Sequence, residues 1–117
     1  MVASLKGDPH SFDKTLLLAM LEMGGFTPLD GGSDTSPQDL VGRVKEHEPD
    51  VLAVPLLTGY AAKNLIEMSS LMEKVKPKPH IVAYGKGTAN LSSHDGPIEE
   101  DTLSALSRIA ELLISKA

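Results

Sequence analysis

The sequence predicts a single α/β domain in which helices cover both faces of a parallel sheet of four to five strands. Short apolar runs alternate along the chain with longer segments whose apolar residues recur at helical spacing. The central run Asp50–Leu57 is apolar after its first residue, as expected of a strand that is buried on both faces. The links between segments are short, and such alternation favours a parallel sheet. A chain of 117 residues has the length of one domain, residues 1–117.

The first quarter of the chain predicts a strand, a helix and a second strand. Met1–Lys6 is short and apolar enough to form the first strand. A helix follows and is ended by Gly24-Gly25, because apolar residues recur there at helical spacing: Leu16, Leu17, Met20 and Leu21. Phe26–Leu29 is predicted to be the second strand, and the turn-forming residues Asp30–Asp34 are predicted to be a loop.

The middle of the chain carries the clearest start signal for a helix. Ser36 can cap this helix, Pro37 suits its first position, and Asp39 lies three residues after the cap. Asp50–Leu57 then forms the third strand, and the spacing of apolar residues predicts a helix over Tyr60–Val75.

The last part of the chain completes the alternation. It predicts a fourth strand at His80–Tyr84, a weak edge strand near Ala89–Ser92 and an amphipathic final helix whose apolar face runs from Leu103 to Leu113. The order of elements predicts a three-layer α/β/α architecture. Its sheet is a flavodoxin-like (Rossmann-like), doubly wound sheet with the strand order 2-1-3-4-5.

The composition argues against several classes of function. The chain has no cysteine, which excludes thiolate nucleophiles and cysteine metal sites. A net charge of −5 and an aromatic content of 3% argue against nucleic acid as a partner. No apolar run approaches the roughly 20 residues that a membrane span needs, and Met1–Lys6 does not resemble a signal peptide. We therefore expect a cytoplasmic protein with no membrane partner.

Ligands of such sheets bind outside the carboxyl ends of the strands, so we expect the site in Gly7–Asp13, Pro55–Gly59 and Gly85–Gly87. In the first loop, Asp8 lies two residues before His10. An aspartate at that spacing can accept a hydrogen bond from one ring nitrogen and leave the other directed for a metal ion or a proton. The alternative interpretation is that both are polar turn residues and that Asp8 caps the following helix.

Four segments, in this order, resemble the cobalamin-binding domain family. Gly7-Asp8-Pro9-His10-Ser11-Phe12-Asp13-Lys14 is similar to the family's Gly-Asp-x-His-x-x-Gly-Lys signature. The segment from Gly25-Phe26 to Ser36-Pro37 looks like its second strand, loop and second helix. Asp50–Thr58 is similar to the strand that carries its Ser-x-Leu motif, and Ile81–Lys86 to the strand that ends in its Gly-Gly motif.

This resemblance implies a role for individual residues. His10 would be the lower ligand of the cobalt ion and Asp8 its orienting partner, while Leu57 and Gly85 match the leucine and the first glycine of the later motifs. The nucleotide tail of the cofactor would enter a slot between the sheet and the first helix. Ser11 and Thr58 would also contact the cofactor.

The sequence departs from the family's pattern at three positions, all of which concern the tail slot. Asp13 stands where the signature has glycine, Pro55 where Ser-x-Leu has serine, and Lys86 where the second glycine is expected. Glycine allows a close approach of the backbone to a ligand, and proline offers neither a hydroxyl nor a backbone N–H.

The resemblance implies a corrinoid-binding module that does no chemistry alone and works as the carrier or small subunit of a methyltransferase or mutase (isomerase) system. Its cofactor would be cobalamin and its partner the catalytic subunit, so no catalytic residue is assigned. The alternative is a degenerate module that keeps the fold but binds no cofactor and acts as a protein-interaction or regulatory subunit.

Overall fold

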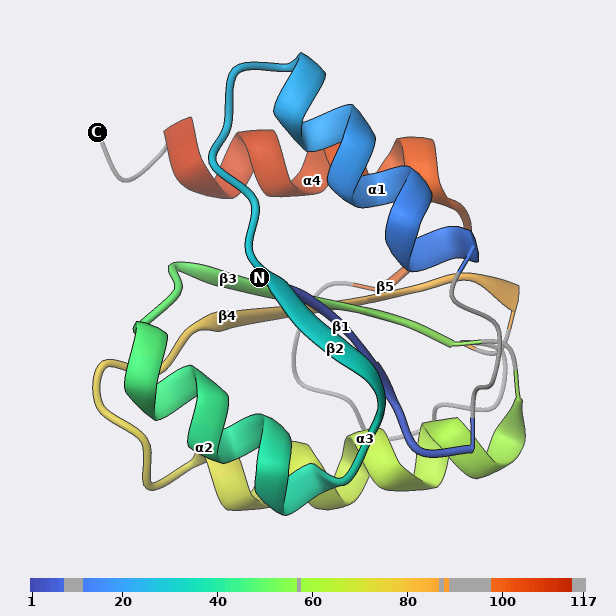
Figure 1. Ribbon diagram of the computed structural model, residues 1–117. Helices are drawn as coiled ribbons and strands as arrows, with labels where there is room; N and C mark the ends of the chain where they lie inside the picture. Colours follow the sequence, from blue (N-terminus) through green and yellow to red (C-terminus); the bar gives the residue numbers. More distant parts are fainter. Residues whose placement is uncertain (8–11, 57, 87, 89–97, 115–117) are drawn as a thin grey trace.

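The computed structural model describes residues 1–7, 12–56, 58–86, 88 and 98–114 (Figure 1). Its sheet is parallel, with the order β2-β1-β3-β4-β5, which confirms the predicted order. The strands are β1 (Val2–Leu5), β2 (Asp30–Thr35), β3 (Val51–Pro55), β4 (His80–Tyr84) and β5 (Ile98–Glu99).

Two helices cover each face of the sheet, as the three-layer prediction requires. Figure 1 shows α1 (Phe12–Met23) and α4 (Thr102–Ile114) on one face and α2 (Pro37–His47) and α3 (Gly59–Met72) on the other. Among the described residues, no helix combines the length and the apolar character that a membrane crossing requires.

The core is divided by the sheet into two clusters, and β4 shows how. Ile81 and Ala83 belong to the cluster beneath α2 and α3, whereas Val82 and Tyr84 belong to the cluster beneath α1 and α4. This division follows from the period of a strand, in which successive side chains point to opposite faces. Each central strand therefore contributes to both clusters, which explains why β3 is apolar along its whole length.

The predicted position of the second strand is wrong. The strand is Asp30–Thr35, which includes the predicted loop Asp30–Asp34, and not the predicted Phe26–Leu29. Phe26 packs on the edge of the core cluster beneath α1 and α4. Gly31 explains the difference, because a Cβ there would lie 2.8 Å from the Cβ of Ala3 on β1. Glycine thus allows β2 to pair closely with β1, and this pairing outweighs the weak strand propensity of the segment.

The start of α2 lies where the sequence predicts it. Ser36 is the N-cap of α2, and its side chain accepts a hydrogen bond from the backbone N–H of Asp39 at 3.1 Å. The fifth strand lies at Ile98–Glu99, while the predicted edge strand at Ala89–Ser92 lies outside the described residues.

Candidate cofactor-binding site

Hydrogen bonds join the segments that follow β1, β3 and β4 at the carboxyl edge of the sheet. The Thr58 hydroxyl donates to the backbone oxygen of Gly7 at 2.9 Å, which links the segment after β3 to the segment after β1. The backbone N–H of Leu56 donates to the oxygen of Tyr84 at 2.8 Å. The Tyr84 hydroxyl donates to the backbone oxygen of Asp13 at 3.0 Å, in the first turn of α1. The described residues of these segments therefore meet at one edge of the sheet.

Thr58 has two structural roles at this edge. It is the N-cap of α3, and its hydroxyl oxygen accepts a hydrogen bond from the backbone N–H of Ala61 at 3.0 Å while the hydroxyl proton goes to Gly7. Asn64, one turn further along α3, donates from its side-chain amide to the backbone oxygen of Lys6 at 2.6 Å. The start of α3 therefore fixes the backbone that leaves β1.

Gly85 follows β4 in a conformation that residues with a Cβ rarely adopt. Its φ is +109°, and a Cβ at this position would lie 2.7 Å from the backbone oxygen of Leu56. Its N–H donates to the oxygen of Glu99 on β5 at 3.0 Å, and its own oxygen accepts a hydrogen bond from the Thr88 hydroxyl at 2.7 Å. The chain thus turns sharply at Gly85 with its backbone close to the neighbouring strand.

A groove of about 420 Å³ lies where α1 and α4 begin and β4 ends. It brings together three of the predicted site residues, namely Asp13, Gly85 and Lys86. It is also lined by residues that the sequence analysis did not assign to the site: Phe12, Glu100, Asp101 and Thr102. Phe12 is 71% exposed, although its large apolar side chain would ordinarily be buried.

The groove carries more negative than positive charge. Asp13, Glu100 and Asp101 supply three carboxylates, and Lys86 supplies the one ammonium group among its lining residues. The Asp101 carboxylate accepts a hydrogen bond from the backbone N–H of Ser104 at 2.8 Å, and this bond is the main cause of the lowered pKa of Asp101. The Asp101 carboxylate thus caps the start of α4, where a negative charge is favourable to the helix dipole.

Beneath the groove, the face of the sheet that α1 covers is filled. Tyr84 is fully buried there, and it pairs across the strands with Pro55, which is also buried. On the other side of β3, the alternation of β1 places Ser4 on the same face, two residues after the pair Val2↔Ala53. Ser4 is buried as well, and its hydroxyl has no hydrogen-bond partner among the described residues.

The other predicted site residues lie outside the part of the chain that the structure describes. These are Asp8, His10, Ser11 and Leu57, and their assigned roles remain predictions. Within the described ranges, no three histidine, aspartate or glutamate side chains gather as a metal site. The residues on either side of the 8–11 segment are described: Gly7 is bonded to Thr58, and Asp13 to Tyr84.

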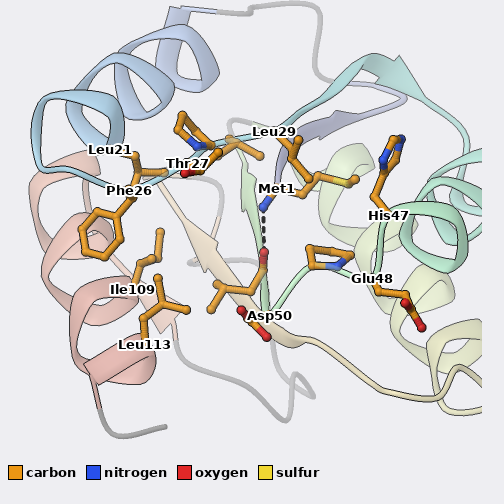
Figure 2. A pocket seen from close by; sticks show the side chains of 14 residues that line it. Met1, Leu21, Phe26, Thr27, Leu29, His47, Glu48, Asp50, Ile109 and Leu113 are labelled. Atoms are coloured by element: carbon orange, nitrogen blue, oxygen red, sulfur yellow. Dashed lines mark hydrogen bonds between the residues drawn. The ribbon is translucent and has the colours of Figure 1, made fainter. Parts of the chain in front are cut away.

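A second pocket, of about 320 Å³, lies at the opposite edge of the sheet (Figure 2). Figure 2 shows apolar side chains of α1 and α4, such as Leu21 and Ile109, on one side and His47 and Glu48 on the other. This edge is formed by the amino ends of β1 and β3, whereas ligands of parallel α/β sheets bind at the carboxyl ends. The groove at the carboxyl edge is therefore the candidate site.

Curated relatives with similar sequences are corrinoid proteins, while no family model matches the chain. The trimethylamine corrinoid protein 2 of Methanosarcina acetivorans is 28% identical over 74 residues, which are 63% of this chain and 34% of that protein. Its namesake from Methanosarcina mazei is 30% identical over 74 residues, with the same shares of each chain. The chain thus spans about a third of the length of the relatives that it matches.

Solved structures share the fold over nearly the whole chain. A cobalamin-binding protein from Desulfitobacterium hafniense superposes with a TM-score of 0.81 at 18% identity, covering 95% of this chain and 57% of that one. The monomethylamine corrinoid protein of Methanosarcina barkeri gives 0.79 at 19% identity, covering 95% and 56%. A methanol:cobalamin methyltransferase complex from the same organism gives 0.74 at 23%, covering 99% and 46%. The chain is therefore similar to corrinoid proteins in sequence and has the fold of cobalamin-binding proteins, which confirms the resemblance predicted from the sequence.

Proposed function

We propose that the chain is a corrinoid-binding module that holds its cofactor over the carboxyl edge of the sheet. One observation carries the proposal: the segments after β1, β3 and β4 are hydrogen-bonded at that edge, where a groove lies between the start of α1, the end of β4 and the start of α4. The sequence similarity to corrinoid proteins supports the same ligand class. A parallel sheet with helices on both faces binds its ligands at this edge, which makes the position physically consistent.

The proposal assigns ligand and positioning roles to named residues. His10 is proposed as the lower cobalt ligand and Asp8 as the acceptor that fixes its tautomer and raises its basicity. Thr58 would support the segment that contains both residues, because its hydroxyl holds Gly7 at 2.9 Å. When bound, a corrinoid supplies a cobalt centre that can accept and donate a methyl group.

The described residues fit a corrin ring better than they fit a nucleotide tail. At the edge, Gly85 keeps the backbone free of a side chain, and the groove beside it is open. Beneath the edge, Tyr84 and Pro55 fill the space next to the first helix in which the resemblance places the tail.

The module would act with a catalytic partner in the cytoplasm. Two comparisons support a methyltransferase as that partner. The similar curated proteins are named trimethylamine corrinoid proteins, and one structural neighbour is a methanol:cobalamin methyltransferase complex. A mutase partner is the second possibility that the resemblance implies. In both cases the substrate site would lie on the partner, and this chain would position the cofactor.

A titration with hydroxocobalamin and diaquacobinamide, followed by visible absorbance, tests the proposed function. We expect a saturable spectral change with the wild-type protein and its loss in His10→Ala. His47→Ala is the matched control, because His47 is exposed at the end of α2, at the opposite edge of the sheet. The absence of a spectral change with both corrinoids would refute the proposal.

A cofactor-free interaction module is the second candidate, and the filled face beneath the groove favours it. Tyr84 and Pro55 are buried in the space by the first helix, and Phe12 is 71% exposed at the groove. Such a module would be stabilised by a protein partner and not by a corrinoid. Thermal denaturation with each corrinoid separates the two candidates, since a ligand that binds the folded state raises the melting temperature.

A further inference from the structure

Tyr84 closes the space between the sheet and α1. Its side chain is fully buried in the core cluster beneath α1 and α4, and its hydroxyl donates to the backbone oxygen of Asp13 at 3.0 Å. This hydrogen bond reaches from the end of β4 to the first turn of α1. The Tyr84 side chain thus extends from the sheet to α1 at the carboxyl end of the strands, next to the groove that Asp13 and Gly85 line.

Among the described neighbouring residues, the hydroxyl of Ser4 is the polar group left unbonded for a ligand that would enter this space. Pro55, directly opposite Tyr84 in the β3–β4 pairing, has neither a hydroxyl nor a backbone N–H. Ser4, on the far side of Pro55, has a hydroxyl that is buried and unbonded among the described residues. An incoming base could reach that hydroxyl only by displacing buried side chains from a close-packed layer.

The charge above this space acts in the same direction. Three carboxylates and one ammonium group line the groove next to this space: Asp13, Glu100, Asp101 and Lys86. A nucleotide tail carries a phosphodiester, and an anion in this groove would be repelled by the excess of negative charge. Packing and electrostatics therefore both disfavour the tail, whereas the amide side chains of a corrin ring carry no negative charge that the groove would repel.

We infer that Tyr84 excludes the nucleotide tail, so that this chain selects its corrinoid by the ring alone and accepts corrinoids that lack a tail. The inference rests on the proposed function, because it specifies which part of the corrinoid the site recognises. Asp13, Pro55 and Tyr84 then act together. The Tyr84 hydroxyl donates to the backbone oxygen of Asp13, and Pro55 lies beside Tyr84 on the neighbouring strand. The departures from the family's pattern at Asp13 and Pro55 are parts of one closed layer.

The test compares hydroxocobalamin with diaquacobinamide, which lacks the tail, on the full chain and two variants. Tyr84→Val shortens the side chain while keeping a residue that suits a strand. Tyr84→Phe is the matched control, because it keeps the ring that fills the space and removes only the hydroxyl. Dissociation constants come from visible absorbance, and circular dichroism at the titration temperature establishes that each variant is folded.

We expect the wild-type protein and Tyr84→Phe to bind the two corrinoids within about threefold of each other. Tyr84→Val opens the space, so we expect it to bind hydroxocobalamin more tightly by about tenfold, with little change for diaquacobinamide. If Tyr84→Val does not fold, the comparison of the two corrinoids on the wild-type protein still decides the question.

A wild-type preference of about tenfold or more for hydroxocobalamin would overturn the inference and leave the proposed function standing. An equal response of both corrinoids to Tyr84→Val would also overturn it, because the change would then not concern the tail. A wild-type protein that binds neither corrinoid would refute the proposed function itself. A single set of titrations therefore distinguishes failure of the inference from failure of the proposed function.

Discussion

Substituting Gly85 by alanine tests the backbone geometry at the centre of the site. The φ of Gly85 is +109°, and a residue with a Cβ loses about 1–2 kcal/mol in such a conformation. The new Cβ would also lie 2.7 Å from the backbone oxygen of Leu56, an atom that cannot rotate away. Overpacking of this kind costs about 1–3 kcal/mol more. We expect Gly85→Ala to lower the free energy of unfolding by about 2–5 kcal/mol in total.

Gly25 provides a matched control within the same chain. Its φ is +88°, but nothing lies within 4 Å of a Cβ built on it, so Gly25→Ala carries the conformational cost alone. For a domain of this size, about 1 kcal/mol corresponds to about 4 °C in melting temperature. Thermal denaturation should show a loss of about 8–20 °C for Gly85→Ala and about 4–8 °C for Gly25→Ala. An equal loss in the two variants would refute the close approach of Gly85 to Leu56.

Two further substitutions test the contacts that hold the site and the edge strand. Thr58→Val removes both the N-cap of α3 and the hydrogen bond to Gly7. We expect chemical denaturation to show a loss of about 1–3 kcal/mol in the free energy of unfolding, most of which Thr58→Ser restores. Equal losses in the two variants would contradict these roles of the hydroxyl. Lys14 is almost fully buried and contacts Asp30 at 2.8 Å, and its hydrogen bond is the main cause of the lowered pKa of Asp30. The lowered pKa means that this contribution is present above the ordinary pKa of the carboxyl group and is lost as the pH falls through its folded value. Melting temperatures from about pH 6 to pH 3 should therefore fall less steeply in Lys14→Met than in the wild-type protein, and parallel curves would contradict this account.

Local signals in the sequence were sufficient for most of the fold. Ser36 and Pro37 marked the start of α2 because N-cap and first-position preferences are local, and the apolar run at Val51–Pro55 marked β3 because burial on both faces leaves no alternation. The strand order 2-1-3-4-5 followed from the alternation of elements and is confirmed.

The strand Asp30–Thr35 could not be predicted from local propensity, because long-range contacts hold it. Asp30 accepts a hydrogen bond from Lys14 on α1 at 2.8 Å, and Arg43 on α2 donates to the backbone oxygen of Gly31. These residues are distant in the sequence, and the strand itself consists of glycine and polar residues that ordinarily form turns.

The candidate site could be predicted in part. The rule that ligands bind at the carboxyl ends of strands was enough to expect Asp13, Gly85 and Lys86 together, and one groove contains all three. The sequence did not predict that Tyr84 fills the space beneath α1. Strand alternation predicts the face of the sheet on which a side chain lies, but not the atom to which its hydroxyl donates. A large polar aromatic residue at the end of a central strand, paired with a proline, was the available signal.

Electron paramagnetic resonance of the chain loaded with cob(II)inamide tests the central claim most directly. This corrinoid has no nucleotide base, so any splitting of the cobalt lines by an axial nitrogen must come from the protein. We expect a triplet splitting in the wild-type protein and in His47→Ala, its change to a doublet when histidine is labelled with ¹⁵N, and its loss in His10→Ala. A spectrum without nitrogen splitting in the wild-type protein, or a splitting that survives in His10→Ala, would contradict the assignment of His10 as the cobalt ligand.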